Sequence, residues 1–447
     1  MKKLPHTYVI IFALIILAAI CTWIVPNGVC QSWQVFSAFF KGFQKTPAII
    51  VFILIIGGAF WILNDTKAID YGVSRFIVYS AKLEKNKFIS CIGADNLFIV
   101  LIMIMFSLFG AIFGMSEETI AFAAIFVPLA IKMGYDSIVG ICMCFLAAGL
   151  GFAGCLLNPF TLGIAQDIAG IKMFSGLQYR LFIWAIITFV GISFVLYYAN
   201  RIKRNPKLSP MYELDRYWRE KATQNIEEQS FNGKVAKREL LILFLVIVSL
   251  IVGVTVFEWG FTQIAALFFF MAIACGVAAK KDANEIAQLF IAGCKDMLSA
   301  AMVVGLASGI IVILEDGKVI DYLLKEISLS LSDSNKLSSL SLMYVFQTLM
   351  NALITSGTAK AAMLMPIFRD ISNMVGLSLQ STVTAFHIGD GFTNLITPTS
   401  GVLIAVLGVA RIPYVKWVKF IWKFILAMVV LGWLLLLPTI FFSLPDF

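Results

Sequence analysis

Apolar stretches long enough to cross a lipid bilayer recur along the whole chain, and they limit its fold more than any other feature. Residues 8–24 and 240–257 are two examples. About 20 apolar residues in a helix span the ~30 Å hydrocarbon layer, where every backbone polar group needs an internal partner. Of the 447 residues, 60% are hydrophobic and 13% are charged, whereas soluble domains are about half apolar and a quarter charged. The sequence therefore predicts an all-α polytopic membrane protein.

Nine segments are candidate crossings, and two further pairs of apolar segments, each split by a short polar turn, are predicted to be helical hairpins. Two of the crossings are too long for one straight helix and carry proline in mid-course, so we expect broken helices there. No small-residue cleavage site follows the first segment, so we expect a retained helix rather than a signal peptide. The crossings are 6–25, 46–63, 136–172, 177–200, 238–257, 261–279, 290–314, 379–411 and 414–443, and the hairpins are 88–113 with 118–133 and 338–354 with 359–373.

Lysine and arginine gather in the loops that this arrangement places on one side of the membrane. The positive-inside rule then predicts a cytoplasmic N-terminus and an extracytoplasmic C-terminus in a bacterial cytoplasmic (inner) membrane. The formal charge of +8 falls in short loops, so we expect lipid contacts and no nucleic-acid partner. Residues 201–237 read as a cytoplasmic connector between the transmembrane halves 1–200 and 238–447.

The two halves carry an internal repeat. Residues 62–71 match residues 313–322 at Ile, Leu, Asp, Lys, Ile, Asp and Tyr, and later motifs follow in the same order. Five predicted changes of side separate the equivalent helices 46–63 and 290–314. Five is odd, so the second copy enters from the opposite side. We therefore predict two inverted-topology repeats with broken helices, an architecture typical of transporters with binding near the midplane.

Four interruptions at membrane depth are the candidate site: the hairpin tips 114–119 and 355–360, and the helix breaks 158–161 and 390–400. Non-helical backbone survives there only if it is buried in protein or lines a wet cavity. Proline alone would kink one helix, but it explains four paired interruptions poorly. Helix N-termini beyond the breaks favour a carboxylate, and the carbonyl ends before them favour a cation. The predicted substrate-binding residues are Ser116, Glu117, Glu118, Thr119, Asn158, Thr161, Ser356, Gly357, Thr358, Lys360, Asp390, Thr393, Asn394, Thr397, Thr399 and Ser400.

Ionisable residues in these elements are the most informative. An ionised carboxylate near the bilayer centre costs ~3 kcal/mol or more unless it is solvated or paired, so Glu117, Glu118 and Asp390 are predicted to mark a pathway. Lys360 is expected to pair with one of the two glutamates or to meet a substrate carboxylate. Glu118, His387 and Asp390 are the candidates for proton or ion coupling. A shallow surface loop for the glutamates and a structural role for His387 are the alternatives.

Several of these motifs also carry a family resemblance. The matching stretches include 57–60, 113–118, 133–137, 151–153, 158–160, 165–170, 356–357, 386–392 and 398–400, and the likeness covers nearly the whole chain. On them the chain resembles the YfcC/ArcD-like basic amino-acid antiporters, which are grouped with the anaerobic four-carbon dicarboxylate carriers in the ion transporter superfamily. The resemblance implies a scaffold plus a mobile transport domain that carries the hairpins, elevator-type alternating access and a homodimer. Lys360 and His387 depart from the family pattern, and an added positive charge disfavours arginine or ornithine unless Glu117 or Glu118 neutralises it.

The sequence thus favours a secondary active transporter of a small charged metabolite, with amino acid exchange (arginine or ornithine) first and a Na⁺- or H⁺-coupled carboxylate or dicarboxylate carrier as the alternative. A channel would use similar breaks, but paired hairpins favour alternating access. An enzyme is not expected. The motifs HExxH, GxSxG and Walker A are missing, and Gly389-Asp390-Gly391 lacks the preceding glycine of intramembrane aspartyl proteases. With two histidines and no CxxC pair, we expect no metal site and no cofactor beyond a coupling Na⁺ or H⁺.

Overall fold

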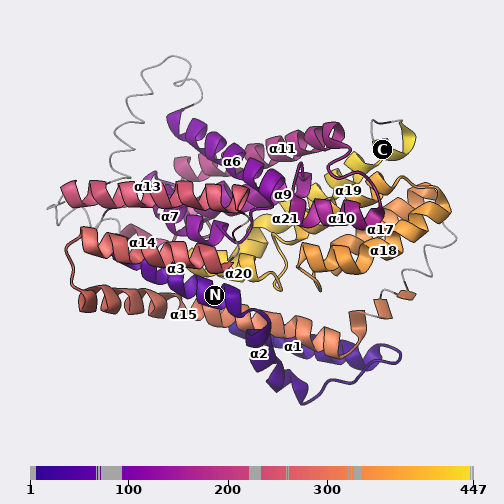
Figure 1. The fold of residues 1–447 in the computed structure, drawn as a ribbon, viewed down its shortest axis with the longest axis horizontal. Helices are drawn as coiled ribbons and strands as arrows, with labels where there is room; N and C mark the ends of the chain where they lie inside the picture. Colours follow the sequence, from indigo (N-terminus) through magenta and orange to yellow (C-terminus); the bar gives the residue numbers. More distant parts are fainter. Residues whose placement is uncertain are drawn as a thin grey trace.

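The computed structural model describes residues 7–66, 68, 71, 93–220, 233–257, 259, 261–320, 322–323, 325–326, 335–442 and 444. Every regular element in these residues is a helix (Figure 1). The first half contains α1 (Thr7–Ile24), α2 (Gln34–Lys45), α3 (Pro47–Asp65), α6 (Ala94–Phe113), α7 (Thr119–Lys132), α8 (Ser137–Ile141), the π-helical turn η1 (Cys142–Leu146), α9 (Ala147–Gly154), the π-helical turn η2 (Pro159–Gly163), α10 (Ile164–Ala169) and α11 (Leu177–Arg204). After the short η3 (Pro206–Leu208) follow α13 (Gly233–Val256), α14 (Phe261–Ala278), α15 (Ala283–Asp316), α17 (Lys336–Met350), α18 (Gly357–Val375), α19 (Leu379–Thr393), α20 (Gly401–Val409), α21 (Tyr414–Leu436) and α22 (Pro438–Phe441).

The described helices include several that are long and apolar enough to cross a membrane. Five qualify singly, and α2 with α3 qualifies as a sixth, bent by 66° at the junction. The five are Ala94–Ile112, Ser137–Gly154, Leu177–Arg204, Ala283–Asp316 and Tyr414–Phe441. Three shorter apolar helices are Ile11–Ile24, Thr119–Lys132 and Thr262–Ala278. The chain is therefore an all-helical, multi-span membrane protein, and the total of nine crossings stays a prediction.

Both long segments with internal proline are broken, as their length required. The first break is 155–158, between α9 and η2, and the second is 394–400, between α19 and α20. Both lie a few residues away from the predicted limits. Helix α19 continues through Asp390 to Thr393. Gly391 lets it pack closely on α9, where an added Cβ would lie 2.5 Å from the Cα of Ala153. Residues 88–92 of the first predicted hairpin and 221–232 of the connector lie outside the described residues.

Three helices, α2, α11 and α13, differ from the predicted boundaries. Helix α2 was not predicted, because its polar face breaks the apolar run; its buried residues are Val35, Ala38 and Gly42. Helices α11 and α13 extend into the predicted connector from both sides, as far as Arg204 and from Gly233.

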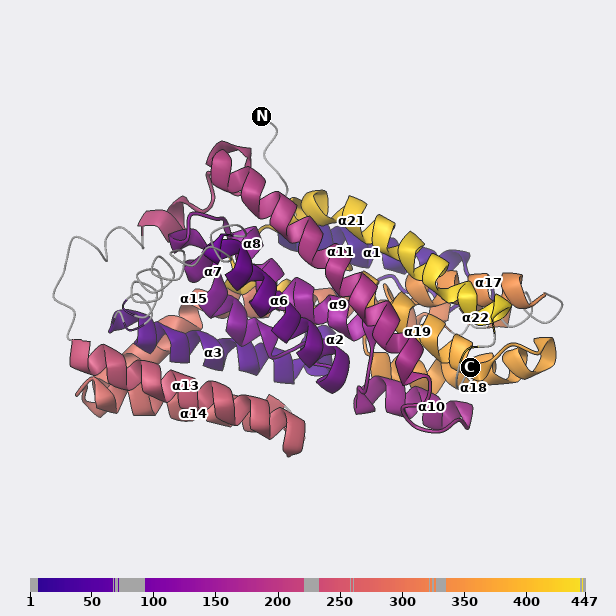
Figure 2. The same ribbon diagram turned by 90° about the horizontal axis from the view of Figure 1, so that it is seen from above.

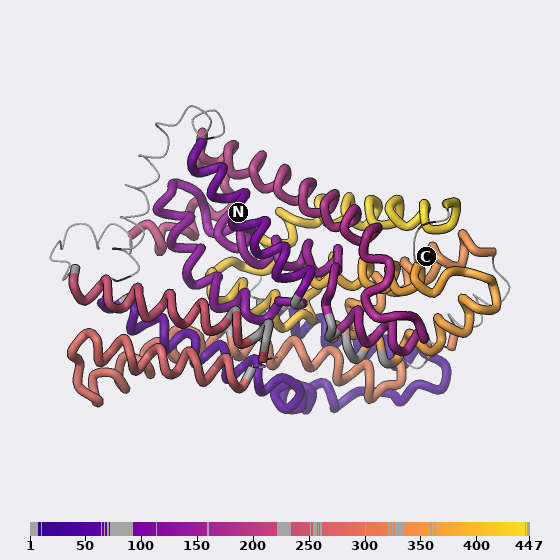
Figure 3. The backbone as a smooth tube through the Cα atoms, turned by 45° about the horizontal axis from the view of Figure 1, so that its top comes forward, coloured from indigo at the N-terminus to yellow at the C-terminus, as the bar shows by residue number. Residues whose placement is uncertain are grey.

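The helices form two packed groups, and each group draws on both halves of the sequence. Helices α1, α2, α3, α13, α14 and α15 pack on one another, with α15 against α1, α2 and α3 (Figures 1 and 3). The second group holds both hairpins (α6–α7 and α17–α18), both broken helices, α11 and α21; Figure 2 shows α11 and α21 side by side on its face. Helix α20 contacts both α15 and α7, so it lies where the groups meet.

Helices that the internal repeat predicts to be equivalent touch each other and run in opposite directions. Thr46, just before α3, lies 3.1 Å from Ser308 late in α15 (Oγ1 to Oγ). The thiol of Cys294, earlier in α15, donates to the Leu54 carbonyl at 3.2 Å. Residue numbers therefore rise along α3 as they fall along α15. Helices α9 and α19 are likewise antiparallel, since Gly149 packs on Leu395 while Ala153 packs on Gly391.

Candidate functional site

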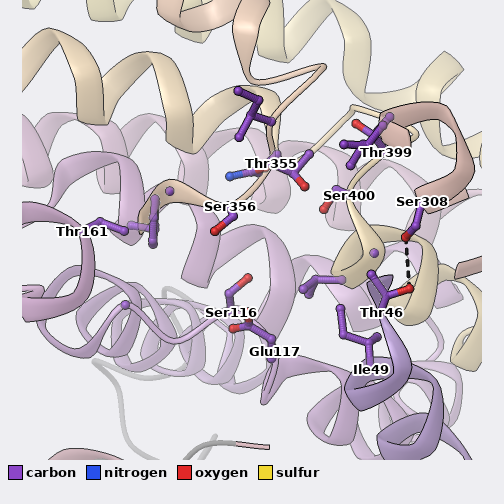
Figure 4. A pocket seen from close by; sticks show the side chains of 18 of the residues that line it. Thr46, Ile49, Ser116, Glu117, Thr161, Ser308, Thr355, Ser356, Thr399 and Ser400 are labelled. Atoms are coloured by element: carbon purple, nitrogen blue, oxygen red, sulfur yellow. Dashed lines mark hydrogen bonds between the residues drawn. The ribbon is translucent and has the colours of Figure 1, made fainter. Parts of the chain in front are cut away.

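A cavity of ≈ 560 Å³ lies where the two hairpin tips and the two helix breaks converge. Figure 4 shows Ser116 and Glu117 on one side of it and Thr355 and Ser356 across from them, with Thr399 and Ser400 beside these. Its lining is Lys45, Thr46, Ile49, Gly114, Ser116, Glu117, Glu118, Phe152, Asn158, Thr161, Trp259, Ile264, Ser308, Ile311, Glu315, Ile354, Thr355, Ser356, Gly357, Asn394, Thr399, Ser400, Gly401 and Val402. Both groups of helices contribute, so the cavity lies between them.

The tip of the first hairpin is held by its own polar groups. Helix α6 ends at Gly114, whose left-handed backbone (φ 68°) turns the chain. The Ser116 amide donates to a Glu118 carboxylate oxygen at 3.1 Å, and the Thr119 hydroxyl donates to the Ser116 carbonyl at 2.5 Å. An added Cβ at Gly114 would lie 2.5 Å from Nδ2 of Asn158. Glycine is therefore needed for the turn and for contact with the first break.

The first break is fixed to the hairpin beside it. The amides of Leu156 and Leu157 both donate to the Ala111 carbonyl, at 2.8 and 3.1 Å. Asn158 accepts from the Thr161 amide through Oδ1 at 3.3 Å. These bonds replace the helical hydrogen bonds that the break interrupts, as membrane depth demands.

The second hairpin and the second break are joined in the same way. The Thr399 hydroxyl donates to the Ala352 carbonyl at 2.7 Å, and the Ser400 hydroxyl caps α20 by accepting from the Leu403 amide at 3.3 Å. At the tip, an added Cβ at Gly357 would lie 2.7 Å from Cγ2 of Thr161 and 3.1 Å from Oδ2 of Asp390. The second tip thus packs against the first break, which brings the two halves together.

Lys360 and Asp390 form an ion pair behind the cavity wall, and both side chains are 0% exposed. The Lys360 ammonium also donates to Oδ1 of Asn351 at 3.1 Å and lies 5.2 Å from the centroid of the Phe386 ring. Asn351 in turn donates to the Asp390 carbonyl at 2.9 Å and to the Thr393 hydroxyl at 2.8 Å. The structure therefore pairs Lys360 with Asp390 instead of with either glutamate of the first tip.

The predicted site residues divide into those on the cavity wall and those behind it. Ser116, Glu117, Glu118, Asn158, Thr161, Ser356, Gly357, Asn394, Thr399 and Ser400 line the cavity, whereas Thr119, Lys360, His387, Asp390, Thr393 and Thr397 do not. The side chain of Thr358 lies outside the described part of the chain. His387 is 1% exposed, with Nε2 3.7 Å from the Cys155 sulfur. Contact of any of these residues with a substrate stays a prediction.

Residues of the first helix group also line the cavity, and sequence reasoning missed them. Thr46 and Ser308 share a hydrogen bond, and Lys45 forms an ion pair with Glu315. The one available signal was Pro47, which places Thr46 at a helix start. Their side chains face the cavity because α3 and α15 pack against α20 of the second group.

The charged side chains of the lining are unbalanced. Glu117, Glu118 and Glu315 meet a single cation, Lys45. Because Lys45 pairs with Glu315, two carboxylates at the first hairpin tip have no lysine or arginine to balance them within the lining. The formal charge of the cavity lining is therefore negative.

Comparison with known proteins identifies the family of this chain. The family model described as "DcuC: C4-dicarboxylate anaerobic carrier" matches residues 40–440. The chain belongs to the DcuC family. This is a family of carriers, so the chain is a transporter and not an enzyme.

Curated relatives of this DcuC-family chain cover most of its length. An Escherichia coli (strain K12) protein named "Putative basic amino acid antiporter YfcC" is 34% identical over 480 residues, 93% of this chain and 92% of the relative. A Haemophilus influenzae (strain Rd) protein named "Uncharacterized protein" is 27% identical, over 90% of this chain and 77% of the relative. Among solved structures, the Alcanivorax borkumensis YdaH transporter is 16% identical, covers 98% of this chain and 99% of its own, and has a TM-score of 0.41.

Proposed function

We propose that this chain is a secondary active transporter that exchanges small charged metabolites, with a basic amino acid such as arginine or ornithine as the first substrate class. The cavity at the meeting of both hairpin tips and both helix breaks carries the proposal. Hydroxyl, amide and carboxylate groups from separate halves surround it. Its ≈ 560 Å³ also falls in the range of small-molecule sites.

The charge of the cavity supports a cationic substrate. Lys360 was the main objection, because a free ammonium at the second tip would repel arginine. The Lys360 ammonium is instead held by Asp390 and Asn351 and lies outside the lining. Glu117 and Glu118 are then available for the cationic groups of the substrate, while the helix N-terminus at Gly357 suits its carboxylate.

Alternating access by an elevator-type movement suits the two helix groups. The proposed transport domain is the group with the hairpins and broken helices, and the proposed scaffold is the group built around α3 and α15. The antiparallel contacts α3–α15 and α9–α19 support inverted repeats. We further propose a homodimer in the bacterial cytoplasmic membrane with a cytoplasmic N-terminus.

Counterflow into proteoliposomes tests the proposal. Vesicles loaded with unlabelled arginine or ornithine should accumulate labelled arginine, whereas vesicles loaded with succinate or buffer should not. Exchange should persist without a Na⁺ or proton gradient. Equal uptake by loaded and empty vesicles would contradict exchange.

A Na⁺- or H⁺-coupled dicarboxylate carrier is the second candidate. It is favoured by the N-termini of α18 and α20, whose first residues Gly357 and Gly401 line the cavity and suit anionic groups, and by the description of the family. Gradient-driven uptake of succinate, with no response to arginine, would establish it in place of exchange. Uptake of neither compound would reject both candidates.

A further inference from the structure

The Lys360–Asp390 pair occupies a position that suits a bound cation. Asn351 is the C-cap of α17, and Asp390 lies in the last turn of α19, which ends at Thr393. Helix C-termini carry partial negative charge. The Asp390 carboxylate and the Asn351 amide oxygen meet the Lys360 ammonium between these two ends. Oxygen donors of these kinds are the ligands that hard cations take in proteins.

Two effects disfavour the Lys360 ammonium at this position. It belongs to the first turn of α18, where its amide donates to the Ser356 carbonyl at 2.9 Å, and a cation is disfavoured at a helix N-terminus. The ammonium is also removed from water completely, which is costly even for a paired charge. The ammonium contacts Asp390, Asn351 and the face of the Phe386 ring. These three neighbours compensate its loss of water.

The first half of the chain builds the equivalent place without charge. Pro128 and Pro366 are both the tenth residue of their helices, α7 and α18, so Phe122 corresponds to Lys360 as the fourth. The match of motif 149–152 with motif 389–392 makes Leu150 the counterpart of Asp390 in the sequence repeat. Phe122 is 4% exposed and Leu150 is 1% exposed. Two buried apolar residues thus stand at the equivalent positions of the first half, so the fold does not require charges there.

We propose that the Lys360 ammonium is a tethered cation which occupies a monovalent-cation site formed by Asp390 and Asn351. The carrier then binds no Na⁺ at this place, and its second half works without Na⁺. Only the statement that the second half works without Na⁺ rests on the proposed transport function. Binding of Na⁺ at the site can be measured without any substrate.

Thermal unfolding of the purified full chain in detergent, in NaCl against choline chloride, tests the proposal. Lys360→Ala removes the ammonium, leaves room and keeps Asp390. This variant should unfold at a lower temperature in choline and regain stability in Na⁺, with a saturable rise of roughly 5 °C or more. The wild type should show no saturable response to Na⁺. The double variant Lys360→Met/Asp390→Leu places apolar residues at both positions, as in the first half, and it should fold without responding to Na⁺.

Each outcome decides the proposal. A saturable Na⁺ response that the wild type shows and the double variant lacks would place Na⁺ at this site and overturn the proposal. A folded Lys360→Ala variant whose unfolding temperature does not change with Na⁺ would also overturn it. If Lys360→Ala does not fold in any salt, the comparison of the wild type with the double variant decides. Failure of counterflow with every substrate would reject the transport proposal and leave this reading intact, so the two failures are distinguishable.

Discussion

Neutralising the two glutamates at the first hairpin tip tests the reasoning about the substrate most directly. Glu117→Gln and Glu118→Gln keep the shape of each side chain and remove one negative charge. In the wild type these carboxylates are the charges of the lining that Lys45 does not balance. We therefore expect each change to weaken the binding of a cationic substrate without closing the cavity.

The size of the effect follows from the charge-assisted hydrogen bond to the substrate that each change removes. A hydrogen bond to a charged group contributes ~1.5–3 kcal/mol. Since 1.4 kcal/mol is about tenfold in affinity, each variant should bind arginine roughly 10–100-fold more weakly. Glu118 also accepts from the Ser116 amide, so its replacement should loosen the tip as well and have the larger effect. The double variant should show no measurable arginine exchange.

Counterflow at varied external arginine gives the KM, and direct binding of labelled arginine gives the Kd. Glu220→Gln is the matched control: it removes the same charge from an exposed position in the connector, where Glu220 pairs with Arg216, and should leave both constants unchanged. Arginine affinity within about twofold of the wild type in both single variants would refute the reasoning. A parallel gain in succinate binding would instead support the dicarboxylate alternative.

Three further results are expected. Gly357→Ala should lower the unfolding temperature and the exchange rate, because its Cβ would lie 2.7 Å from Cγ2 of Thr161 and overpacking costs ~1–3 kcal/mol; Gly163→Ala, whose Cβ would meet only the flexible end of a methionine, is the mild control. Asn351→Ala should lower the unfolding temperature in detergent, because it removes an acceptor from a buried ammonium at ~1–3 kcal/mol; unchanged unfolding would contradict the buried network. Burial raises the pKa of Asp215, in the connector, to about 6. The native state then holds this proton more tightly than the unfolded state, so stability should fall as pH rises from about 4 to 6, and Asp215→Asn should lose that slope in a pH series of thermal unfolding.

Much of the architecture could be predicted because the bilayer acts on local sequence. Spanning helices need long apolar runs, and breaks at membrane depth need proline, glycine and small polar residues. The α9–η2 and α19–α20 breaks and both hairpin turns were therefore recognisable from composition and order alone, and membership of a carrier family is confirmed. Helix α2 escaped prediction because its polar face hides it from a search for apolar length.

The sequence by itself determined that the chain is a multi-span helical protein with paired interruptions and a few charges among them. The tertiary structure alone decided which of these charges meet. From the sequence, Lys360 was expected to pair with Glu117, Glu118 or a substrate carboxylate. The packing of α18 on α19 pairs it with Asp390 instead, with Gly357 and Thr161 between that pair and the cavity. It also brought Thr46 and Ser308 from the other helix group to the cavity wall. The reason is physical: local sequence sets where a helix starts, bends and ends, whereas side chains on different helices meet according to helix rotation and depth, which only the packing of the whole chain fixes.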